Sequence, residues 1–316
     1  MLRQRARVGG LARRCYAASA ASSSSTTPPD DEKEAPSGSS TTSFGFRTVP
    51  EEDKERLVGN VFHSVASNYD VMNDLMSGGM HRVWKDIFVG ELGVGASARQ
   101  NLQVLDVAGG TGDIAFRIAD GMAAARPATA PAPADVADAD TDDGPRIVVS
   151  DINTSMLEEG RKRASELNPS RTRRWPKMEW VVADAERLPF GDEEFDVYTI
   201  AFGIRNVTRI DAALREAHRV LRPGGRFLCL EFSKVTNPLL RAAYEKYSFS
   251  VIPEIGRAVA SDAASYQYLV ESIQKFPDQE AFAAKIGDAG FAAVTHTNLT
   301  AGVVAVHSGV KLPAQS

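Results

Sequence analysis

Residues Leu102–Asp113 read LQVLDVAGGTGD. A short apolar run ends at Asp106, a glycine-rich turn follows at Gly109–Gly112, and a helix-like apolar pattern begins at Asp113. Strand, tight glycine turn and helix start is the arrangement in which an α/β sheet presents a bound nucleotide. Glycines let the backbone approach a ligand closely because they carry no Cβ. The stretch therefore predicts a parallel α/β fold with a ligand at the end of this strand.

The spacing of the turn separates it from a dinucleotide site. NAD and FAD fingerprints read G-x-G-x-x-G and cradle a pyrophosphate at a helix N-terminus. Here the acid precedes the glycines in D-x-A-x-G-x-G, which resembles the first motif of class I S-adenosylmethionine (SAM) methyltransferases. SAM carries no phosphate, and its ammonium and sulfonium charges suit an acidic loop. Asp106, Gly110 and Gly112 are therefore expected at a SAM site, with a purely structural turn as the alternative.

The rest of the domain alternates apolar strands with helical patterns. Further strands are expected at 147–151, 178–183, 195–202 and 226–232, with two short ones within 294–306 that form an antiparallel hairpin at the sheet edge. Helices are expected at 210–221 (closed by a turn at 222–225), over two stretches within 237–276, and from 277 to 290. Repeated βα units of this length imply a parallel sheet covered by helices on both faces. The expected fold class is α/β with a mostly parallel seven-stranded sheet, and the resemblance of the glycine motif implies the Rossmann-like, class I SAM-dependent methyltransferase type.

Composition bounds the class of protein. The 316 residues are 43% hydrophobic and 24% charged, which is ordinary for a soluble globular enzyme. The net charge of −5 gives no reason to expect nucleic-acid binding. The two cysteines, Cys15 and Cys229, lie far apart and argue against a disulfide scaffold. No apolar run approaches the ~20 residues that span a bilayer.

The N-terminal 43 residues differ in composition from the rest. Residues 1–20 carry five arginines and no acid and lead into a serine tract, which predicts a mitochondrial transit peptide; a plastid leader and a disordered basic tail are the alternatives. Residues 21–43 are rich in Ser, Thr and Pro and predict a disordered linker. The methyltransferase domain is then 44–316, and its Ala/Pro/Asp low-complexity segment, 126–144, is expected to be a surface insertion.

Residues 44–92 precede the sheet and are expected to be helical. Val58, Val61, Phe62 and Val65 recur at helical spacing. The following stretch, 69–84, interleaves polar and aromatic residues too densely for a plain surface helix. In a methyltransferase this segment would form an N-terminal helical lid over the SAM site.

Acids follow three successive strands of the expected sheet. Because strand ends at one edge of a parallel sheet line the ligand crevice, Asp106, Asp151 and Asp184 are expected to meet there. Asp151 would accept both ribose hydroxyls, and Asp184 with the Ala185 backbone would meet adenine. Each acid alone is better explained as a helix cap or a solvated loop residue, but three in succession favour the ligand.

Arg205 and Asn206 follow the fourth strand, where the methyl acceptor is expected. Methyl transfer from a sulfonium is an in-line displacement that depends on positioning. Arg205 is expected to stabilise the developing oxyanion of a phenol-type acceptor, and Asn206 to orient it; a structural salt bridge is the alternative for Arg205. His63 and His81 are candidate bases by residue type, although a lone histidine is more often structural. No residues have metal-ligand spacing, so no metal is expected.

Residues 237–260 are rich in leucine, tyrosine and isoleucine with few acids. Plain core packing is the favoured interpretation. An apolar substrate channel and contact with a membrane surface are the alternatives.

Several longer stretches carry a family resemblance. YDVMNDLMSGGMHRVW (69–84) and RVLRPGGRFLCLEFS (219–233) resemble the two signatures of the ubiquinone/menaquinone biosynthesis C-methyltransferases. VFHSVASNYD, DAERLPF, FGIRNV and NLTAGVVAVHSG are similar to the same family, so the resemblance covers about 44–309. It implies SAM-dependent C-methylation of 2-methoxy-6-polyprenyl-1,4-benzoquinol to 5-methoxy-2-methyl-3-polyprenyl-1,4-benzoquinol in ubiquinone synthesis. It also implies peripheral attachment to the matrix side of the mitochondrial inner membrane within a coenzyme Q biosynthetic complex, with a homodimer left open.

The resemblance assigns SAM contacts to Thr111, Asp151, Asp184 and Ala185. The catalytic residues expected for the domain are Tyr69, Arg205 and Asn206, the last two from their place after the fourth strand. Two departures stand out: Arg222 occupies a turn position where the family usually has Lys, and Ala201 occupies one where bacterial members often have a SAM-contacting Ser. The second departure removes one hydroxyl contact.

Three other functions stay open at this point. The same motifs serve a naphthoquinol C-methyltransferase of menaquinone or phylloquinone synthesis, which a plastid leader would favour. A non-catalytic scaffold of the biosynthetic complex would require a damaged SAM site, against which the intact acids and glycines speak. A NAD-dependent enzyme is disfavoured by the absent G-x-G-x-x-G.

Overall fold

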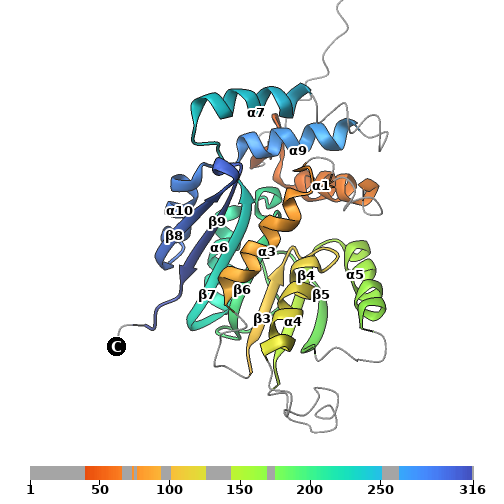
Figure 1. Ribbon diagram of the computed structural model, residues 1–316, viewed down its shortest axis with the longest axis vertical. Coiled ribbons are helices and arrows are strands. Elements are labelled where there is room, and N and C mark those ends of the chain that lie inside the picture. Colours follow the sequence, from red (N-terminus) through yellow and green to blue (C-terminus); the bar gives the residue numbers. More distant parts are fainter. Residues whose placement is uncertain are drawn as a thin grey trace, which may run out of the picture. The chain divides into compact units, whose positions relative to one another are not determined.

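The computed structural model describes residues 40–65, 73–74, 77–93, 101–125, 144–168, 175–250 and 263–314. Its central element is a seven-stranded sheet with the order β5-β4-β3-β6-β7-β9-β8 (Figure 1). The strands are β3 Gln103–Val107, β4 Arg146–Asp151, β5 Lys177–Val182, β6 Phe195–Ala201, β7 Leu221–Phe232, β8 Ala292–Leu299 and β9 Val304–Val310. Strands β5 to β7 are parallel, while β9 and β8 are antiparallel and close one edge. The predicted α/β sheet and its edge hairpin are confirmed.

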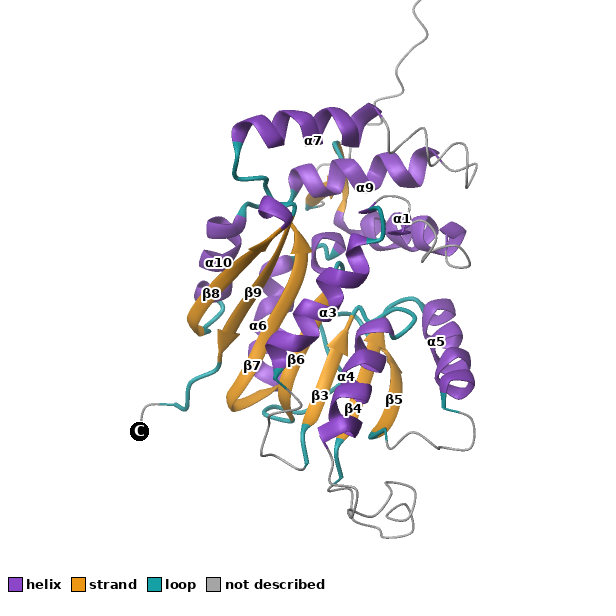
Figure 2. Ribbon diagram, viewed as in Figure 1, coloured by secondary structure: helices purple, strands orange, loops and turns teal. Residues whose placement is uncertain are grey.

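The strands are apolar on both faces because helices cover both (Figure 2). On one face, Val104 and Ile147 pack with α3 (Met80–Leu92) and α4 (Asp113–Ala125). On the other, Leu105 and Val148 pack with α6 (Ile210–Val220) and α10 (Gln279–Asp288). Side chains alternate between the faces of a strand, so neighbouring residues of one strand enter opposite cores. Continuous apolar strands are typical of parallel sheets buried on both faces.

Helix caps fix the loops that follow the strands. Asn153 caps α5 (Thr154–Leu167) by accepting hydrogen bonds from the backbone N–H groups of Ser155 and Met156. Asp278 caps α10 in the same way at Ala281, at the helix start predicted from Pro277 and Asp278. Asn and Asp satisfy the free N–H groups of a first helical turn, which is why they are preferred there. The cap at Asn153 lies two residues from the end of β4 and so helps to position Asp151.

An N-terminal hairpin was not predicted. Strands β1 (Thr41–Phe44) and β2 (Arg47–Pro50) pair antiparallel ahead of α1 (Glu51–Val65). Phe44 is buried and its ring stacks on Tyr268 of α9 (Ala263–Lys275), with centroids 4.2 Å apart. The linker prediction for 21–43 is therefore wrong at its end, because Thr41–Ser43 belong to β1. The strand is polar and four residues long, so its sequence pattern is weak, and its anchor lies more than 200 residues away.

Residues 222–225, which were predicted to form a turn after the helix, belong to strand β7, which begins at Leu221. Leu221 pairs with Phe195, and the register between β6 and β7 shifts before Val197. Gly224 has a φ of 79°, which favours glycine.

Two helices, α7 (Pro238–Ser250) and α9, lie within 237–276 as predicted. Residues 1–39, the insertion apart from Gly144, and Tyr69 lie outside the described residues.

Candidate active site

A pocket lies at the carboxyl ends of β3, β4 and β6 and beside β5. Its lining includes the glycine turn after β3, the acids that follow the strands, and the short helix η4 (Ile204–Asn206) after β6. Glu55, Val58 and Gly59 of α1 complete it from the N-terminal segment, in keeping with the predicted lid. Its open volume, including solvent space at the mouth, is about 1290 Å³.

The glycine turn has no space for side chains. A Cβ on Gly109 would lie 2.6 Å from Cγ1 of Val149 and 2.9 Å from Oδ2 of Asp106. A Cβ on Gly112, where φ is 84°, would lie 2.6 Å from the Trp180 ring. The turn therefore lies against the sheet with bare backbone facing the pocket, which is what a close ligand contact requires.

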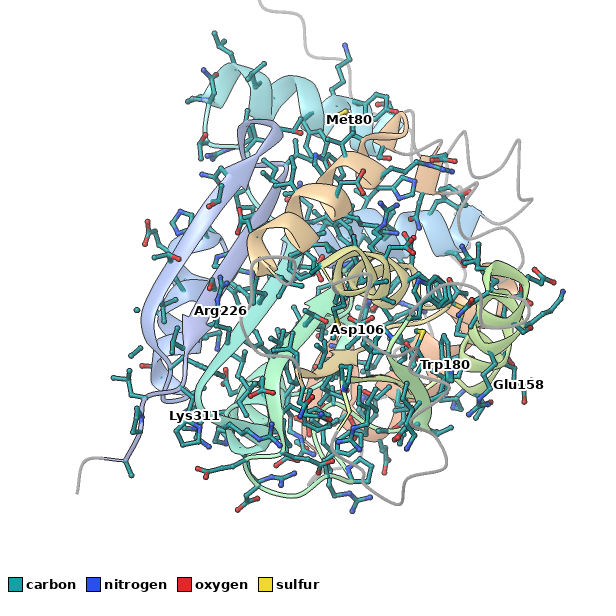
Figure 3. All side chains as sticks on the ribbon, turned by 60° about the horizontal axis from the view of Figure 1, so that its bottom comes forward. Met80, Asp106, Glu158, Trp180, Arg226 and Lys311 are labelled. Carbon is teal, nitrogen blue, oxygen red and sulfur yellow. The ribbon has the colours of Figure 1, made fainter. Side chains whose placement is uncertain are left out.

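Asp106 lies in the interior at the end of β3 (Figure 3). One carboxylate oxygen accepts a hydrogen bond from Oγ1 of Thr199 at 2.7 Å, and the other, Oδ2, has no partner among the described residues. Burial raises the pKa of Asp106 to about 7, and Asp113 and Asp151 add to the rise. The carboxyl group lies directly against the glycine turn, since its Oδ2 is 2.9 Å from the Cβ position of Gly109.

Asp151 joins the glycine turn to the next loop. Its carboxylate accepts hydrogen bonds from the N–H of Gly110 at 3.0 Å and the N–H of Asn153 at 2.8 Å. Burial raises its pKa, while these backbone N–H groups oppose the rise. A carboxylate fixed at both oxygens keeps lone pairs for ligand hydroxyls, so its position fits the predicted ribose contact.

Asp184 and Ala185 line the pocket at the β5 side. One oxygen of Asp184 accepts the N–H of Glu186 at 2.9 Å, and Ala185 is buried. Thr111 lines the pocket at the glycine turn, and its hydroxyl accepts a hydrogen bond from Arg163 at 2.8 Å. Six of the seven residues predicted for SAM therefore line one pocket, and the seventh, Gly112, belongs to the same glycine turn but does not line it.

The charge of the lining suits a cationic ligand. Six carboxylates face the pocket, and among its described lining residues Lys85 is the only cation. The acids are Glu55, Asp106, Asp113, Asp151, Asp184 and Glu186. SAM carries an ammonium and a sulfonium against a single carboxylate, so the donor set and the bare glycine turn both fit it. A phosphate-bearing dinucleotide would be repelled by the same acids.

Two backbone positions beside the turn are strained. Ala108 and Phe202 follow β3 and β6 directly and have φ values of 50° and 56°, which residues with a Cβ rarely adopt. Both residues line the pocket. Gly203, which follows Phe202, has no room for a side chain, because its Cβ would lie 2.5 Å from the Cβ of Ala108. Strain of this kind collects at functional sites.

Asn206 faces the same pocket from η4. Its Oδ1 accepts a hydrogen bond from the hydroxyl of Tyr268 at 3.0 Å. Burial raises the pKa of Tyr268 to about 12, so its hydroxyl stays protonated and donates. The amide nitrogen of Asn206 has no partner among the described residues and is available to an acceptor.

Arg205 is placed differently from the expectation. Its guanidinium pairs with Glu231 of β7 at 3.0 Å and donates to the carbonyl of Phe202, and its side chain is only 3% exposed. It lines a smaller neighbouring pocket with Lys54 and Tyr268, not the larger one. The structural salt bridge, which was the alternative, is what the structure contains.

Of the remaining candidates, only His81 has a side chain that the structure describes. His81 contacts Asp74 at 2.7 Å and does not line the pocket. Tyr69 and the side chain of His63 lie outside the described residues. Across the described part of the chain, no group of three metal-binding side chains occurs.

Sequence reasoning missed Lys85, Glu231 and Tyr268. Glu231 had a signal that could have been used, because it is a charge within an apolar strand and charges are rarely buried unless paired. Lys85 had no such signal, since charged residues also surround it in the sequence. Tyr268 had none, because its partner lies 62 residues away.

Comparison with known proteins agrees with this geometry. Residues 48–311 match the model of the ubiE/COQ5 methyltransferase family. The chain is 52% identical over 286 residues to the mitochondrial 2-methoxy-6-polyprenyl-1,4-benzoquinol methylase of Danio rerio, covering 86% of this chain and 85% of that one. It is 51% identical over 288 residues to the Homo sapiens protein of the same name (87% and 85%). It is 52% identical over 274 residues to the ubiquinone/menaquinone biosynthesis C-methyltransferase UbiE of Cereibacter sphaeroides strain KD131 (87% and 98%).

A solved structure supports the fold alone. The chain aligns with the complex of the Haloferax volcanii Trm112 methyltransferase activator and its methyltransferase, at a TM-score of 0.51 and 13% identity, covering 80% of this chain and 98% of that one. The predicted fold class, SAM dependence and methyltransferase activity are confirmed. This chain belongs to the ubiE/COQ5 methyltransferase family.

Proposed function

We propose that this chain transfers a methyl group from SAM to a ring carbon of 2-methoxy-6-polyprenyl-1,4-benzoquinol, giving 5-methoxy-2-methyl-3-polyprenyl-1,4-benzoquinol in ubiquinone synthesis. Relatives that carry the name of this methylase are 51–52% identical to the chain over 86–87% of its length. The observation that carries the proposal is that one pocket holds both the acidic strand ends and Asn206.

At the donor end, SAM when bound supplies a methyl group on a sulfonium. Asp151 would accept the ribose hydroxyls, and Asp184 with the Ala185 backbone would receive the adenine. The turn containing Gly110 and Gly112 lets the ligand lie against backbone. These residues act by holding the donor in one orientation, which is the main contribution that an in-line displacement needs.

At the acceptor end, the ring carbon becomes nucleophilic when the neighbouring hydroxyl ionises. The amide nitrogen of Asn206 donates to that oxygen and stabilises its developing charge. Tyr268 holds the amide in the orientation that points its N–H groups into the pocket, because its hydroxyl occupies Oδ1 at 3.0 Å. In this proposal Asn206 orients the acceptor, which is the role that its place after β6 suggested.

Arg205 acts by positioning in this proposal. Its bonds to Glu231 and to the carbonyl of Phe202 fix the strained start of η4, which carries Asn206. Tyr69 stays a predicted catalytic residue.

A naphthoquinol acceptor and a non-catalytic scaffold are the alternatives. Isothermal titration calorimetry of the full chain with SAM tests the scaffold alternative, because a scaffold with a damaged site would not bind SAM. Parallel assays with reduced short-tailed 2-methoxy-benzoquinol and reduced demethylnaphthoquinone, with product detected by mass, separate the two acceptors. The proposal expects turnover of the benzoquinol at least ~10-fold faster; preferential methylation of the naphthoquinol would overturn it.

We further propose a peripheral place on the matrix side of the mitochondrial inner membrane, within a coenzyme Q biosynthetic complex; a homodimer is compatible with this. The names of the curated relatives include the word mitochondrial. In the described part of the chain, no helix is long and apolar enough to cross a bilayer.

The start of α7 is the surface proposed for membrane contact. Leu239 and Leu240 are 84% and 51% exposed, and Arg241 beside them can meet anionic headgroups. Leu239→Ser/Leu240→Ser is expected to reduce sedimentation of the chain with anionic vesicles severalfold while leaving SAM affinity unchanged. Leu312→Ser, at another exposed leucine, is the matched control; equal loss in both variants would contradict this surface.

A further inference from the structure

We infer that Lys85 binds the carboxylate of the methionine part of SAM and so sets which end of the pocket receives the amino-acid group. The inference rests on the proposed function in taking SAM as the ligand. It goes beyond the predicted SAM contacts, all of which lie near the end of β3, on the glycine turn, at the end of β4 or after β5.

Charge balance in the pocket points to Lys85. SAM brings one anionic group into a lining that has six carboxylates. Without a cation, the SAM carboxylate would be held in a field of like charge, which costs binding free energy. Lys85 is the only cation among the described lining residues.

The position of Lys85 is fixed before any ligand binds. It lies on α3, its side chain is 8% exposed, and its ammonium donates to Oδ2 of Asp113 at 2.7 Å. Asp113 is also contacted by Arg117 at 3.3 Å. A lysine ammonium has three donors, and the described residues give Lys85 one partner, so donors remain for a ligand.

The location of Asp113 adds to the case. Asp113 opens α4 directly after Gly112, so the ammonium of Lys85 lies at the N-terminus of that helix. A helix N-terminus carries positive partial charge from its free N–H groups. The ammonium and the helix end together form an anion-binding corner in an otherwise acidic pocket.

The sheet order places this corner opposite the adenine end. Asp184 follows β5, Asp151 ends β4, and the glycine turn follows β3, in the order in which the strands lie side by side. Helix α3 packs against α4 and β7, beyond the glycine turn from β5. A ligand with its adenine at Asp184 and its ribose at Asp151 therefore extends its amino-acid group toward Lys85. The sulfonium is left between them, beside Phe202 and Asn206 at the acceptor end.

Decarboxylated SAM provides the test because it keeps the adenosine, sulfonium and ammonium and lacks only the carboxylate. The full chain and its Lys85→Met variant would be titrated with both ligands by isothermal calorimetry. Lys85→Met is expected to weaken SAM binding ~10- to 100-fold, the effect of losing a charge-assisted hydrogen bond. Its affinity for decarboxylated SAM is expected to stay within ~3-fold of the unchanged protein, which also shows that the variant is folded.

Arg117→Met is the matched control, since it removes the other cation on Asp113 without touching the pocket lining. It is expected to leave the preference for SAM over decarboxylated SAM intact. Equal weakening of both ligands by Lys85→Met would overturn the inference and make Lys85 a structural partner of Asp113. Unchanged SAM affinity would overturn it as well. Failure of the unchanged protein to bind SAM would refute the proposed function instead.

Discussion

Asp106 places an acid where burial opposes its charge. Its pKa of about 7 lies above its ordinary value of 3.8. Between pH 3.8 and pH 7, the carboxyl group is therefore protonated in the folded state and ionised in the unfolded state. The stability that this group contributes is complete below pH ~4 and declines as pH rises toward ~7. We expect Asp106→Asn to stabilise the ligand-free protein at pH 7.5 by on the order of 1–3 kcal/mol, because the amide stays neutral.

Calorimetric melting from pH 4.5 to 8 tests this. The melting temperature of Asp106→Asn minus that of the unchanged protein should grow as pH rises and level off above ~7. A difference that does not change with pH would contradict the raised pKa.

Arg205 and Glu231 form a buried ion pair, and removing one partner leaves the other charge unpaired. We expect Arg205→Ala to lower turnover at least ~10-fold with SAM affinity retained, since the residue positions η4 and does not line the donor pocket. Steady-state kinetics and calorimetric SAM titration measure the two effects.

Arg205→Met/Glu231→Met separates positioning from simple folding, because apolar residues of similar size often replace a buried pair without loss of stability. We expect the double variant to fold and bind SAM, with turnover still low because the bond to the Phe202 carbonyl is missing. Full turnover in the double variant would contradict the positioning role.

The donor residues could be predicted because each follows a strand, and the sheet brings strand ends together whatever the intervening sequence. The Arg205–Glu231 pair could not be predicted in this way. Glu231 lies within a strand 26 residues further along, and its pairing depends on the alignment of β6 with β7. Lys85 likewise reaches the pocket through the packing of α3 on α4, which no local pattern specifies.

At the scale of elements, α5 approaches β5 through a glycine. A Cβ on Gly160 would lie 2.3 Å from the Trp180 ring and 3.2 Å from backbone at Thr111. Figure 3 places Trp180 beside α5, where Glu158 is labelled. We expect Gly160→Ala to destabilise the protein by ~1–3 kcal/mol through overpacking and to weaken SAM binding, because the glycine turn would shift.

Gly287 of α10 supplies the control, as nothing lies within 4 Å of its Cβ position. Gly287→Ala should raise stability by ~0.5–1 kcal/mol, the ordinary gain of alanine over glycine in a helix. Chemical denaturation measures both variants. Equal changes in the free energy of unfolding for Gly160→Ala and Gly287→Ala would contradict the close approach of α5 to β5.

The long elements followed from their sequence patterns, whereas the short ones did not. Parallel strands and amphipathic helices such as α6 have periodic apolar residues that identify them. β1 and β2 are four residues each, and β1 is held by stacking of Phe44 on Tyr268. Tertiary contact, not local sequence, stabilises that hairpin.

At the scale of the whole molecule, the N-terminal segment is predicted to direct import. Residues 1–39 fused to a fluorescent protein should accumulate in mitochondria, because the membrane potential draws in leaders whose first residues, here 1–20, are rich in arginine and carry no acid. Replacing the five arginines by glutamine should abolish import, which fluorescence microscopy measures. Accumulation in plastids would contradict the mitochondrial assignment and favour a naphthoquinol acceptor.

The central claim is methylation of a benzoquinol ring carbon. The most direct measurement incubates the full chain with trideuteromethyl-labelled SAM and reduced short-tailed 2-methoxy-benzoquinol, then locates the label by mass fragmentation and NMR. The account predicts one labelled methyl group on the unsubstituted ring carbon next to the prenyl-bearing carbon, where it replaces a hydrogen, and none on oxygen. Label on a hydroxyl oxygen, or no product from a chain that binds SAM, would contradict it.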